Sequence, residues 1–374
     1  MNNKKTVLIC IGTRPEAIKM APVYFAFLKS GYNTKLCVTA QHRDLLDQVL
    51  QFFKIKPDFD LDLMTPNQSL NKLSSRILDG IDGIFSTHKI DLVLVHGDTT
   101  TSSVIALAAF NRKIKVGHVE AGLRTYNKYA PFPEEINRQL TGRLADYHFA
   151  PGVNAKQNLV NEGVNDNTIL VTGNTVIDAL HIASGILDSG FKTDMIDQLI
   201  KTIDFNKKII LVTGHRRENF GEGFESICDA LEALSEDSDV ELIFPVHLNP
   251  NVQDVVYKRL SNLKNIHLIA PLDYPTFIWV MKQSHLIISD SGGVQEEAPT
   301  FGVPVLVTRT VTEREEGVNA GCSFLVGTNQ DLIITKAKDI LCNSSQNQKI
   351  SNPYGDGDAS KKIVDFFEYQ DDRK

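Results

Sequence analysis

Short, fully apolar runs alternate with longer helical segments along almost the whole of this 374-residue chain. Such runs are typical of parallel strands whose two faces are both buried, and parallel strands need long crossover connections between them. The alternation therefore predicts an α/β protein built on open parallel sheets. The predicted strands lie at 7–11, 36–39, 92–95 and 115–119, and then at 209–212, 242–245, 266–269, 286–289 and 305–307. The predicted helices between the first strands lie at 15–30, 45–53, 70–85 and 101–110.

Two separate sets of strands indicate two domains, because 374 residues exceed what one ordinary core accommodates. We expect two Rossmann-like domains with a cleft between them. The first is predicted to cover residues 1–172 and the second residues 173–358. A turn at 352–357 precedes a final helix over 359–369.

Composition and charge exclude several classes of protein. A net charge of −7 argues against nonspecific nucleic-acid binding, which needs a basic surface. The longest apolar runs have the length of a strand, far below the roughly 20 residues of a membrane-spanning helix. The N-terminus leads directly into a strand without a secretory signal, so we expect a cytoplasmic protein. Five scattered cysteines without CxxC spacing predict free thiols, with neither a disulfide framework nor a zinc site.

The residues after the first strand have the pattern of an anion-binding turn. Gly12 permits a tight turn, and the helix that follows begins with exposed backbone N–H groups that favour an anion. Arg14 is placed to fork onto a phosphate or a carboxylate. Lys19 lies more than one helical turn further along, and taken alone it fits an ordinary solvated lysine better than a ligand contact.

Three carboxylates follow strand ends or turns in the first half of the chain. Asp98 and Glu120 come after two strands of the same predicted sheet, and Glu134 follows a proline-rich turn. Each one alone fits a helix cap. Together at one edge of a sheet they would raise at least one pKa among them, which suits proton transfer.

The second half carries a pattern for a diphosphate. His215 follows one strand, and Ser291, Gly292 and Gly293 follow another, where small residues at a helix start allow close backbone approach. Two features are left open. Glu296 and Glu297 either complement the helix dipole alone, or one of them accepts both hydroxyls of a ribose, and Arg309 and Arg314 in the next loop face either phosphate or carboxylate. The residues alone predict a nucleotide-sugar enzyme.

At these motifs the chain resembles the non-hydrolysing UDP-N-acetylglucosamine 2-epimerases, in order and over nearly its whole length. The matching stretches include GTRPEAIKMAP at 12–22, HGDTTT at 96–101, HVEAGLRT at 118–125, PFPEEINRQL at 131–140, GHRREN at 214–219, DSGGVQEEAP at 290–299, RTVTEREEG at 309–317 and NPYGDG at 352–357. The resemblance implies a GT-B-like fold, a homodimer, and a C-terminal helix within 359–374 that crosses back to the first domain. It also implies reversible C2 epimerisation of UDP-GlcNAc to UDP-ManNAc without metal or cofactor, which supplies ManNAc-type sugars for cell-surface polysaccharide.

The same resemblance assigns roles to individual residues. The catalytic positions are Asp98, Glu120, Glu134 and His215. The substrate-binding positions are Arg14, Lys19, Asp98, Glu120, His215, Leu272, Phe277, Ser291, Gly292, Gly293, Glu297 and Arg314, with Glu297 on the ribose. A second, allosteric UDP-GlcNAc position involves Gln41, His42 and His247. Leu272 stands where relatives carry Gln, so a backbone contact alone is implied there.

Three other functions fit all or part of the pattern. An epimerase for another UDP-N-acetylamino sugar would share every motif, and a retaining glycosyltransferase of the GT-B fold would share the diphosphate cradle. A noncatalytic nucleotide-sugar sensor would need the cradle but not Asp98, Glu120 and Glu134 together.

Overall fold

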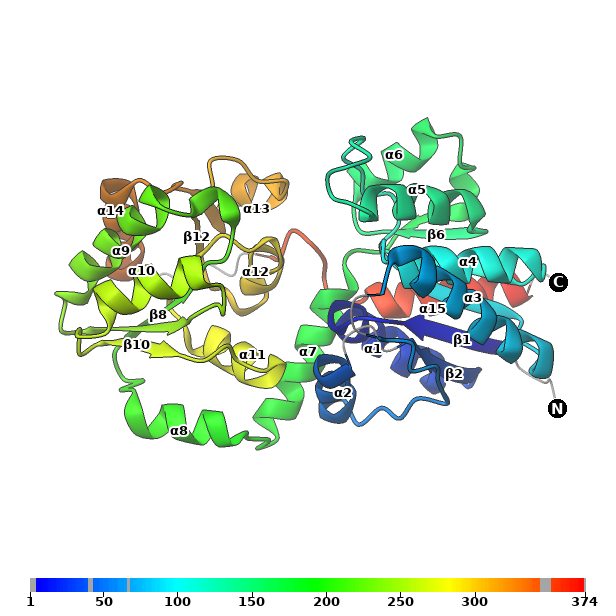
Figure 1. Ribbon diagram of the computed structural model, residues 1–374, viewed down its shortest axis with the longest axis horizontal. Coiled ribbons are helices and arrows are strands. Elements are labelled where there is room, and N and C mark those ends of the chain that lie inside the picture. Colours follow the sequence, from blue (N-terminus) through cyan, green and yellow to red (C-terminus); the bar gives the residue numbers. More distant parts are fainter. Residues whose placement is uncertain (1–4, 40–42, 66–67, 344–350, 373–374) are drawn as a thin grey trace. The chain divides into compact units, whose positions relative to one another are not determined.

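The computed structural model describes residues 5–39, 43–65, 68–343 and 351–372. The chain forms two compact units, each built on its own parallel sheet (Figure 1). Unit 1 extends to His181 and takes up the chain again from Gly355, and unit 2 spans Ile182–Tyr354. The chain therefore first leaves unit 1 inside one helix, α7 (Thr175–Asp188).

The sheet of unit 1 has seven parallel strands in the order β3-β2-β1-β4-β5-β6-β7. Its strands are β1 (Thr6–Ile11), β2 (Asn33–Val38), β3 (Phe59–Asp60), β4 (Leu92–His96), β5 (Lys115–Val119), β6 (Tyr147–Ala150) and β7 (Ile169–Val171). Its helices are α1 (Arg14–Lys29), α2 (Arg43–Phe52), α3 (Leu70–Thr87), α4 (Thr100–Asn111), α5 (Glu134–Leu144), α6 (Val153–Asn161), the first part of α7, and α15 (Ala359–Asp372). A short 3-10 turn, η1 (Asp166–Thr168), precedes β7.

Helices cover both faces of this sheet because alternate side chains of each strand point to opposite faces. On one face, Leu8 and Val93 pack in a core with Ile77 of α3 and Ile105 of α4. On the other face, α15 packs against α1 and β6, and the ring of Phe367 lies 5.8 Å from that of Phe27 and 5.5 Å from that of Phe149. The C-terminal helix thus returns to unit 1, as the sequence predicts.

The sheet of unit 2 has six parallel strands in the order β10-β9-β8-β11-β12-β13. Its strands are β8 (Lys208–Thr213), β9 (Val240–Pro245), β10 (Ile266–Ile269), β11 (Leu286–Ser289), β12 (Val305–Val307) and β13 (Ser323–Leu325). Its helices are the rest of α7, α8 (Asp194–Thr202), α9 (Glu222–Ser235), α10 (Pro250–Leu260), α11 (Tyr274–Gln283), α12 (Gly292–Glu297), α13 (Glu315–Asn319) and α14 (Gln330–Asn343). Two 3-10 turns, η2 (Arg217–Asn219) and η3 (Ala298–Phe301), complete it.

Alternation along β8 builds a core on each side of the second sheet. Ile210 and Val212 join the cluster that includes side chains of α9, α10 and α14. Ile209 and Leu211 join the opposite cluster with side chains of α8 and α11. Both faces of β8 therefore require apolar side chains. The resulting uninterrupted apolar run is the signal that predicts this strand from sequence.

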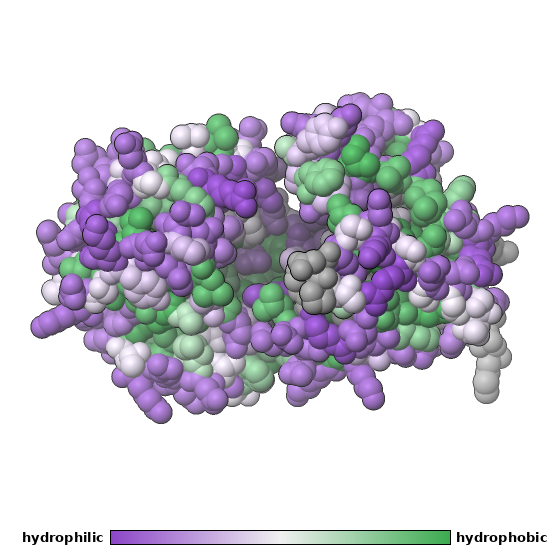
Figure 2. All heavy atoms as spheres, viewed as in Figure 1, coloured by the Kyte–Doolittle hydropathy of each residue, from purple (hydrophilic) through white to green (hydrophobic). Residues whose placement is uncertain are grey.

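The predicted α/β fold with two parallel-sheet domains is confirmed, and every predicted strand is present. Four strands, each of two to four residues, were not predicted: β3, β6, β7 and β13. The predicted domain limits of 1–172 and 173–358 stay a prediction. Among the described residues, no helix is both long and apolar enough to cross a membrane. Hydrophilic side chains cover most of the face seen in Figure 2.

Gly12 tests how tightly the first turn of unit 1 is packed. A Cβ atom there would lie 2.3 Å from Thr101 Oγ1 and 2.6 Å from Thr39 Oγ1, so Gly12→Ala must displace buried hydroxyls. We expect a loss of about 1–3 kcal/mol in the free energy of unfolding, measured by urea denaturation. Gly83→Ala is the control, since its Cβ would meet nothing within 4 Å in the interior of α3 and should stabilise by about 0.5–1 kcal/mol. Equal stability of Gly12→Ala and the wild type would contradict this packing.

Candidate active site

In both sheets the strand order reverses at one point, which is where open α/β sheets bind ligands. The reversal lies between β1 and β4 in unit 1 and between β8 and β11 in unit 2. Arg14 and Asp98 follow β1 and β4, and His215 and Ser291 follow β8 and β11, at the carboxyl ends of these strands. Glu120 follows β5, the neighbour of β4.

In unit 1 the loop after β5 presents Glu120 to two basic side chains. Lys19 Nζ forms a hydrogen-bonded ion pair with Glu120 Oε2, and His96 Nε2 lies 3.7 Å from the same oxygen. The Lys19 and Glu120 side chains are 17% and 15% exposed, so Lys19 is not a solvated surface lysine. Burial lowers the pKa of His96 to about 4, which keeps its ring neutral near pH 7.

The backbone at Glu120 is held in an unusual conformation. Its φ of 60° lies in the left-handed region, which costs free energy for a residue with a Cβ atom. Two hydrogen bonds fix the neighbouring turn: Gly97 N–H donates to Val119 O at 2.9 Å, and His118 Nε2 lies 2.7 Å from Gly97 O. These contacts aim the Glu120 carboxylate toward Lys19.

Asp98, at the end of β4, is paired with Arg138 of α5. Arg138 Nη2 donates to Asp98 Oδ2 at 2.5 Å, and Arg138 Nη1 lies 3.6 Å from a Glu135 oxygen. Burial raises the pKa of Asp98, the Arg138 charge lowers it, and the charges of Glu120 and Glu134 raise it further. The three predicted carboxylates therefore lie within electrostatic range of one another. Arg138 is a site residue that the sequence analysis missed.

Two adjacent glutamates at the start of α5 have different surroundings. Glu135 is fully buried and accepts the backbone N–H groups of Thr125 and Tyr126, both at 3.0 Å. It also accepts from Gln139 at 2.7 Å, so this carboxylate holds the loop that follows Glu120. Glu134 is partly exposed and belongs to the carboxylate cluster.

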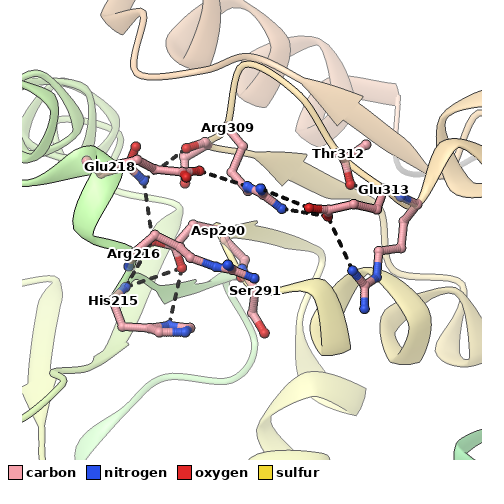
Figure 3. A network of polar contacts seen from close by, with 12 residues as sticks. His215, Arg216, Glu218, Asp290, Ser291, Arg309, Thr312 and Glu313 are labelled. Carbon is pink, nitrogen blue, oxygen red and sulfur yellow. Dashed lines mark hydrogen bonds and ion pairs between the residues drawn. The ribbon is translucent and has the colours of Figure 1, made fainter. Parts of the chain in front are cut away.

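In unit 2 the buried carboxylate of Asp290 organises the turn after β8 (Figure 3). It accepts the backbone N–H groups of His215 at 2.9 Å and Arg216 at 2.8 Å. His215 Nδ1 lies 3.3 Å from Asp290 Oδ1, which orients the imidazole. Burial lowers the pKa of His215, while the Asp290 charge opposes this shift. The ring of His215 stacks on that of His247, with centroids 5.6 Å apart.

Arg314 lies against the first residue of α12. A Cβ atom on Gly292 would meet Arg314 Cζ at 2.7 Å, so only glycine admits the guanidinium there. Glu296 Oε1 accepts from Arg314 Nε at 3.0 Å and lies 3.0 Å from Nη2. Glu296 is therefore one partner of Arg314. Tyr354 fastens this region as well, since its hydroxyl donates to Arg314 O at 3.1 Å.

The Arg309 side chain is buried and paired with carboxylates of unit 2. Its side chain is 6% exposed, and it donates to Glu218 at 2.8 Å and to Glu313 at 3.0 Å (Figure 3). Of the two partners left open for Arg309, phosphate or carboxylate, the structure shows carboxylates. The Arg309 guanidinium lowers the pKa of Glu313 to about 2.

The remaining predicted residues have varied surroundings. Arg14 forms no hydrogen bond or ion pair within the described part of the chain. Ser291 N–H donates to Ser289 Oγ at 3.0 Å, and Gly293 is exposed. Leu272 is buried and Phe277 is half-buried in the core beneath α11.

Gln41 and His42 lie outside the described residues. No three His, Cys, Asp or Glu side chains are grouped to hold a metal ion in the ranges that the structure describes.

Comparison with known proteins gives a consistent result. The family model described as UDP-N-acetylglucosamine 2-epimerase matches residues 28–368. A UDP-N-acetylglucosamine 2-epimerase of Campylobacter jejuni is 51% identical and covers 97% of each chain, and one of Salmonella typhimurium is 50% identical over 96% of this chain and 97% of its own. The crystal structure of UDP-GlcNAc 2-epimerase from Neisseria meningitidis bound to UDP-GlcNAc is 47% identical, with a TM-score of 0.85, and covers 97% of this chain and 100% of that chain.

Fold and site together define a two-domain, GT-B-like enzyme of the nucleotide-sugar class. Within that class, the chain belongs to the UDP-N-acetylglucosamine 2-epimerase family.

Buried histidines in unit 1 predict a loss of stability in mild acid. Burial lowers the pKa of His96, His118 and His148 to about 4, 3 and 4. The unfolded chain binds protons below its ordinary pKa near 6.5, whereas the folded chain does not, so stability is full above that pKa and falls as pH decreases. Each ring should cost about 2 kcal/mol between pH 7.5 and 5.

His118→Gln isolates one of these contributions. Urea unfolding at pH 7.5 and pH 5 should show a pH-dependent loss smaller than wild type by about 2 kcal/mol. The matched control, His181→Gln, removes an exposed histidine and should leave the wild-type difference intact. An unchanged difference in His118→Gln would mean that His118 is not a source of the acid sensitivity.

Proposed function

We propose that this protein reversibly converts UDP-N-acetylglucosamine into UDP-N-acetylmannosamine by inversion at C2. Membership of the family supports the reaction. The observation that carries the proposal is the pair of carboxylates at the ends of neighbouring strands, Glu120 beside Lys19 and Asp98 beside Arg138. Epimerisation needs a base on one face of the sugar and an acid on the other, and paired carboxylates provide both.

The chemistry explains why proton transfer needs departure of UDP first. C2 of the sugar is next to no carbonyl, so its proton is not acidic in the ground state. Cleavage of the C1–O bond, with its electron pair leaving on UDP, gives an oxocarbenium-like centre that acidifies C2–H. A carboxylate then takes the proton while C1=C2 forms, which gives 2-acetamidoglucal and UDP. Protonation of C2 on the opposite face and return of UDP to C1 give the epimer.

In unit 1 we assign proton transfer to Asp98, Glu120 and Glu134. Burial raises the pKa of Asp98, so this carboxyl exchanges a proton closer to neutral pH than an exposed aspartate does. Lys19 forms an ion pair with Glu120, and this pairing supports the use of Glu120 as a base. Arg14, at the start of α1, is assigned to the substrate's phosphates.

In unit 2 we assign the nucleotide to the residues around β8 and α12. His215, held by Asp290, faces the departing diphosphate together with Arg314 and the backbone at the start of α12. Glu296 accepts from Arg314, and the resemblance to the family assigns Glu297 to the ribose hydroxyls. The nucleotide-binding set is Leu272, Phe277, Ser291, Gly292, Gly293, Glu297 and Arg314, with the first two at the uracil.

The proposal extends to the setting of the enzyme. We place it in the cytoplasm as a homodimer that supplies ManNAc-type sugars for cell-surface polysaccharide. An allosteric UDP-GlcNAc position would use Gln41, His42 and His247, and the stacking of His247 on His215 supports a link between that position and the diphosphate.

Proton NMR of the purified protein with UDP-GlcNAc alone in D₂O tests the reaction. We expect UDP-ManNAc to appear and deuterium to enter C2 of the sugar, because the C2–H bond breaks during each inversion. Release of free UDP with free N-acetylmannosamine would indicate a hydrolysing enzyme. No change at all would overturn the proposal in favour of another UDP-sugar or a glycosyltransferase that needs an acceptor.

Amide variants test the three carboxylates. Asp98→Asn, Glu120→Gln and Glu134→Gln should each lower kcat by roughly 10²- to 10⁴-fold, because each removes a group that exchanges a proton. UDP should bind each variant as it binds the wild type in isothermal titration calorimetry. Glu236→Gln, an exposed amide change in unit 2, is the control for turnover. Wild-type turnover in all three variants would contradict the assignment of proton transfer to these carboxylates.

A further inference from the structure

A buried carboxylate lies at the reversal point of the first sheet and has no place in the proposed chemistry. Glu16, in the first turn of α1, is 2% exposed. Its Oε2 atom accepts the backbone N–H groups of Gly12 at 2.9 Å and Thr13 at 2.8 Å, and the Thr13 hydroxyl at 2.8 Å. Its Oε1 atom accepts the hydroxyl of Thr99 at 2.7 Å, across 83 residues of sequence.

This arrangement exceeds what a helix cap requires. In a capping box, the acid at the third helical position accepts the N–H of the cap residue alone. Glu16 also holds Gly12, and it reaches Thr99, which is itself the cap of α4 and accepts from Ser102 N–H at 3.1 Å. One carboxylate therefore joins the starts of two helices.

The two turns that Glu16 joins each carry a residue assigned to the substrate. Arg14 follows Thr13 at the start of α1, and Asp98 precedes Thr99. The strands before these turns, β1 and β4, are direct neighbours in the sheet. The carboxylate thus fixes how far the Asp98 turn lies from the Arg14 turn.

The surroundings of Glu16 require that this link be made. No described lysine, arginine or histidine forms an ion pair with Glu16, and a buried carboxylate without a cation depends on its hydrogen-bond donors. Burial raises the pKa of Glu16 and the hydrogen-bond donors lower it, and the net result is a pKa of about 7. Losing the Thr99 hydroxyl leaves Oε1 without its donor, so the Asp98 turn has no tie to α1 through this carboxylate.

We propose that Glu16 is a positioning residue, which sets Asp98 relative to Arg14 through its hydrogen bond to Thr99. The assignment rests on the proposed epimerase function. It distinguishes the two oxygens: Oε2 holds the Arg14 turn, and Oε1 holds the Asp98 turn. Cutting the Oε1 link displaces the proton-transfer group while the Arg14 turn stays in place.

Substitutions at Thr99 separate this link from ordinary helix capping. Thr99→Val removes the hydroxyl, and we expect kcat for C2 epimerisation to fall roughly 10- to 100-fold, with KM for UDP-GlcNAc and the dissociation constant of UDP unchanged. Thr99→Ser keeps the hydroxyl and should restore kcat. Thr193→Val is the matched control in unit 2: Thr193 caps α8 by accepting from Ile196 N–H at 3.1 Å, and its hydroxyl bonds Thr276 Oγ1 at 2.8 Å, also 83 residues away. It should lose stability as Thr99→Val does and keep wild-type kcat.

Each outcome has one meaning. Wild-type kcat in Thr99→Val, with a loss of stability equal to that of Thr193→Val, would make Glu16 a cap and overturn the assignment. An inactive wild type would overturn the proposed function, and this assignment with it. If Thr99→Val does not fold, Thr99→Ala carries the test, because it also removes the hydroxyl and sets no methyl group against Oε1. Unchanged kcat in Thr99→Ala would then overturn the assignment.

Discussion

Buried carboxylates that accept backbone N–H groups hold the turns at the strand ends of both units. Glu16 binds two consecutive N–H groups after β1, Glu135 binds two in the loop after β5, and Asp290 binds two after β8. Turns at the carboxyl end of a parallel sheet have no strand partner for their N–H groups, and burial makes an unpaired donor costly. A carboxylate satisfies several such donors at once and leaves the rest of the turn free to present a functional side chain.

Charge pairing makes the carboxylate cluster of unit 1 compatible with a folded protein. Burial raises the pKa of Asp98, the charges of Glu120 and Glu134 raise it further, and three unpaired charges in one cluster would destabilise the fold. Lys19 and Arg138 come from two different helices, and each pairs with one of the strand-end acids. The two pairs offset two of the three carboxylate charges, and the cluster keeps ionisable groups that can exchange protons with a substrate.

The sequence predicted the parts of this protein whose signal is local. Strands buried on both faces, such as β1 and β8, have uninterrupted apolar runs, and turns such as that at Gly12 stand out by residue type. The short strands β3 and β13 exist through pairing with a neighbouring strand, which no local pattern records. Side-chain pairing could not be predicted from local sequence either. Lys19 alone fits a surface lysine, and its partner Glu120 lies 101 residues away. Adjacent acids such as Glu296 and Glu297 were indistinguishable in sequence, and only the structure shows that Glu296 accepts from Arg314.

The turns after β4 and β5 of unit 1 share a backbone conformation but carry different residues. Gly97 after β4 and Glu120 after β5 both have φ near 60°, a conformation that glycine adopts without strain. The position after β4 uses glycine, whose carbonyl then accepts from His118. The position after β5 carries a glutamate in the same strained region, and a glycine there would remove the carboxylate that meets Lys19 and His96. Strain at Glu120 persists because the surrounding hydrogen bonds fix the turn, so the side chain is aimed before any substrate arrives.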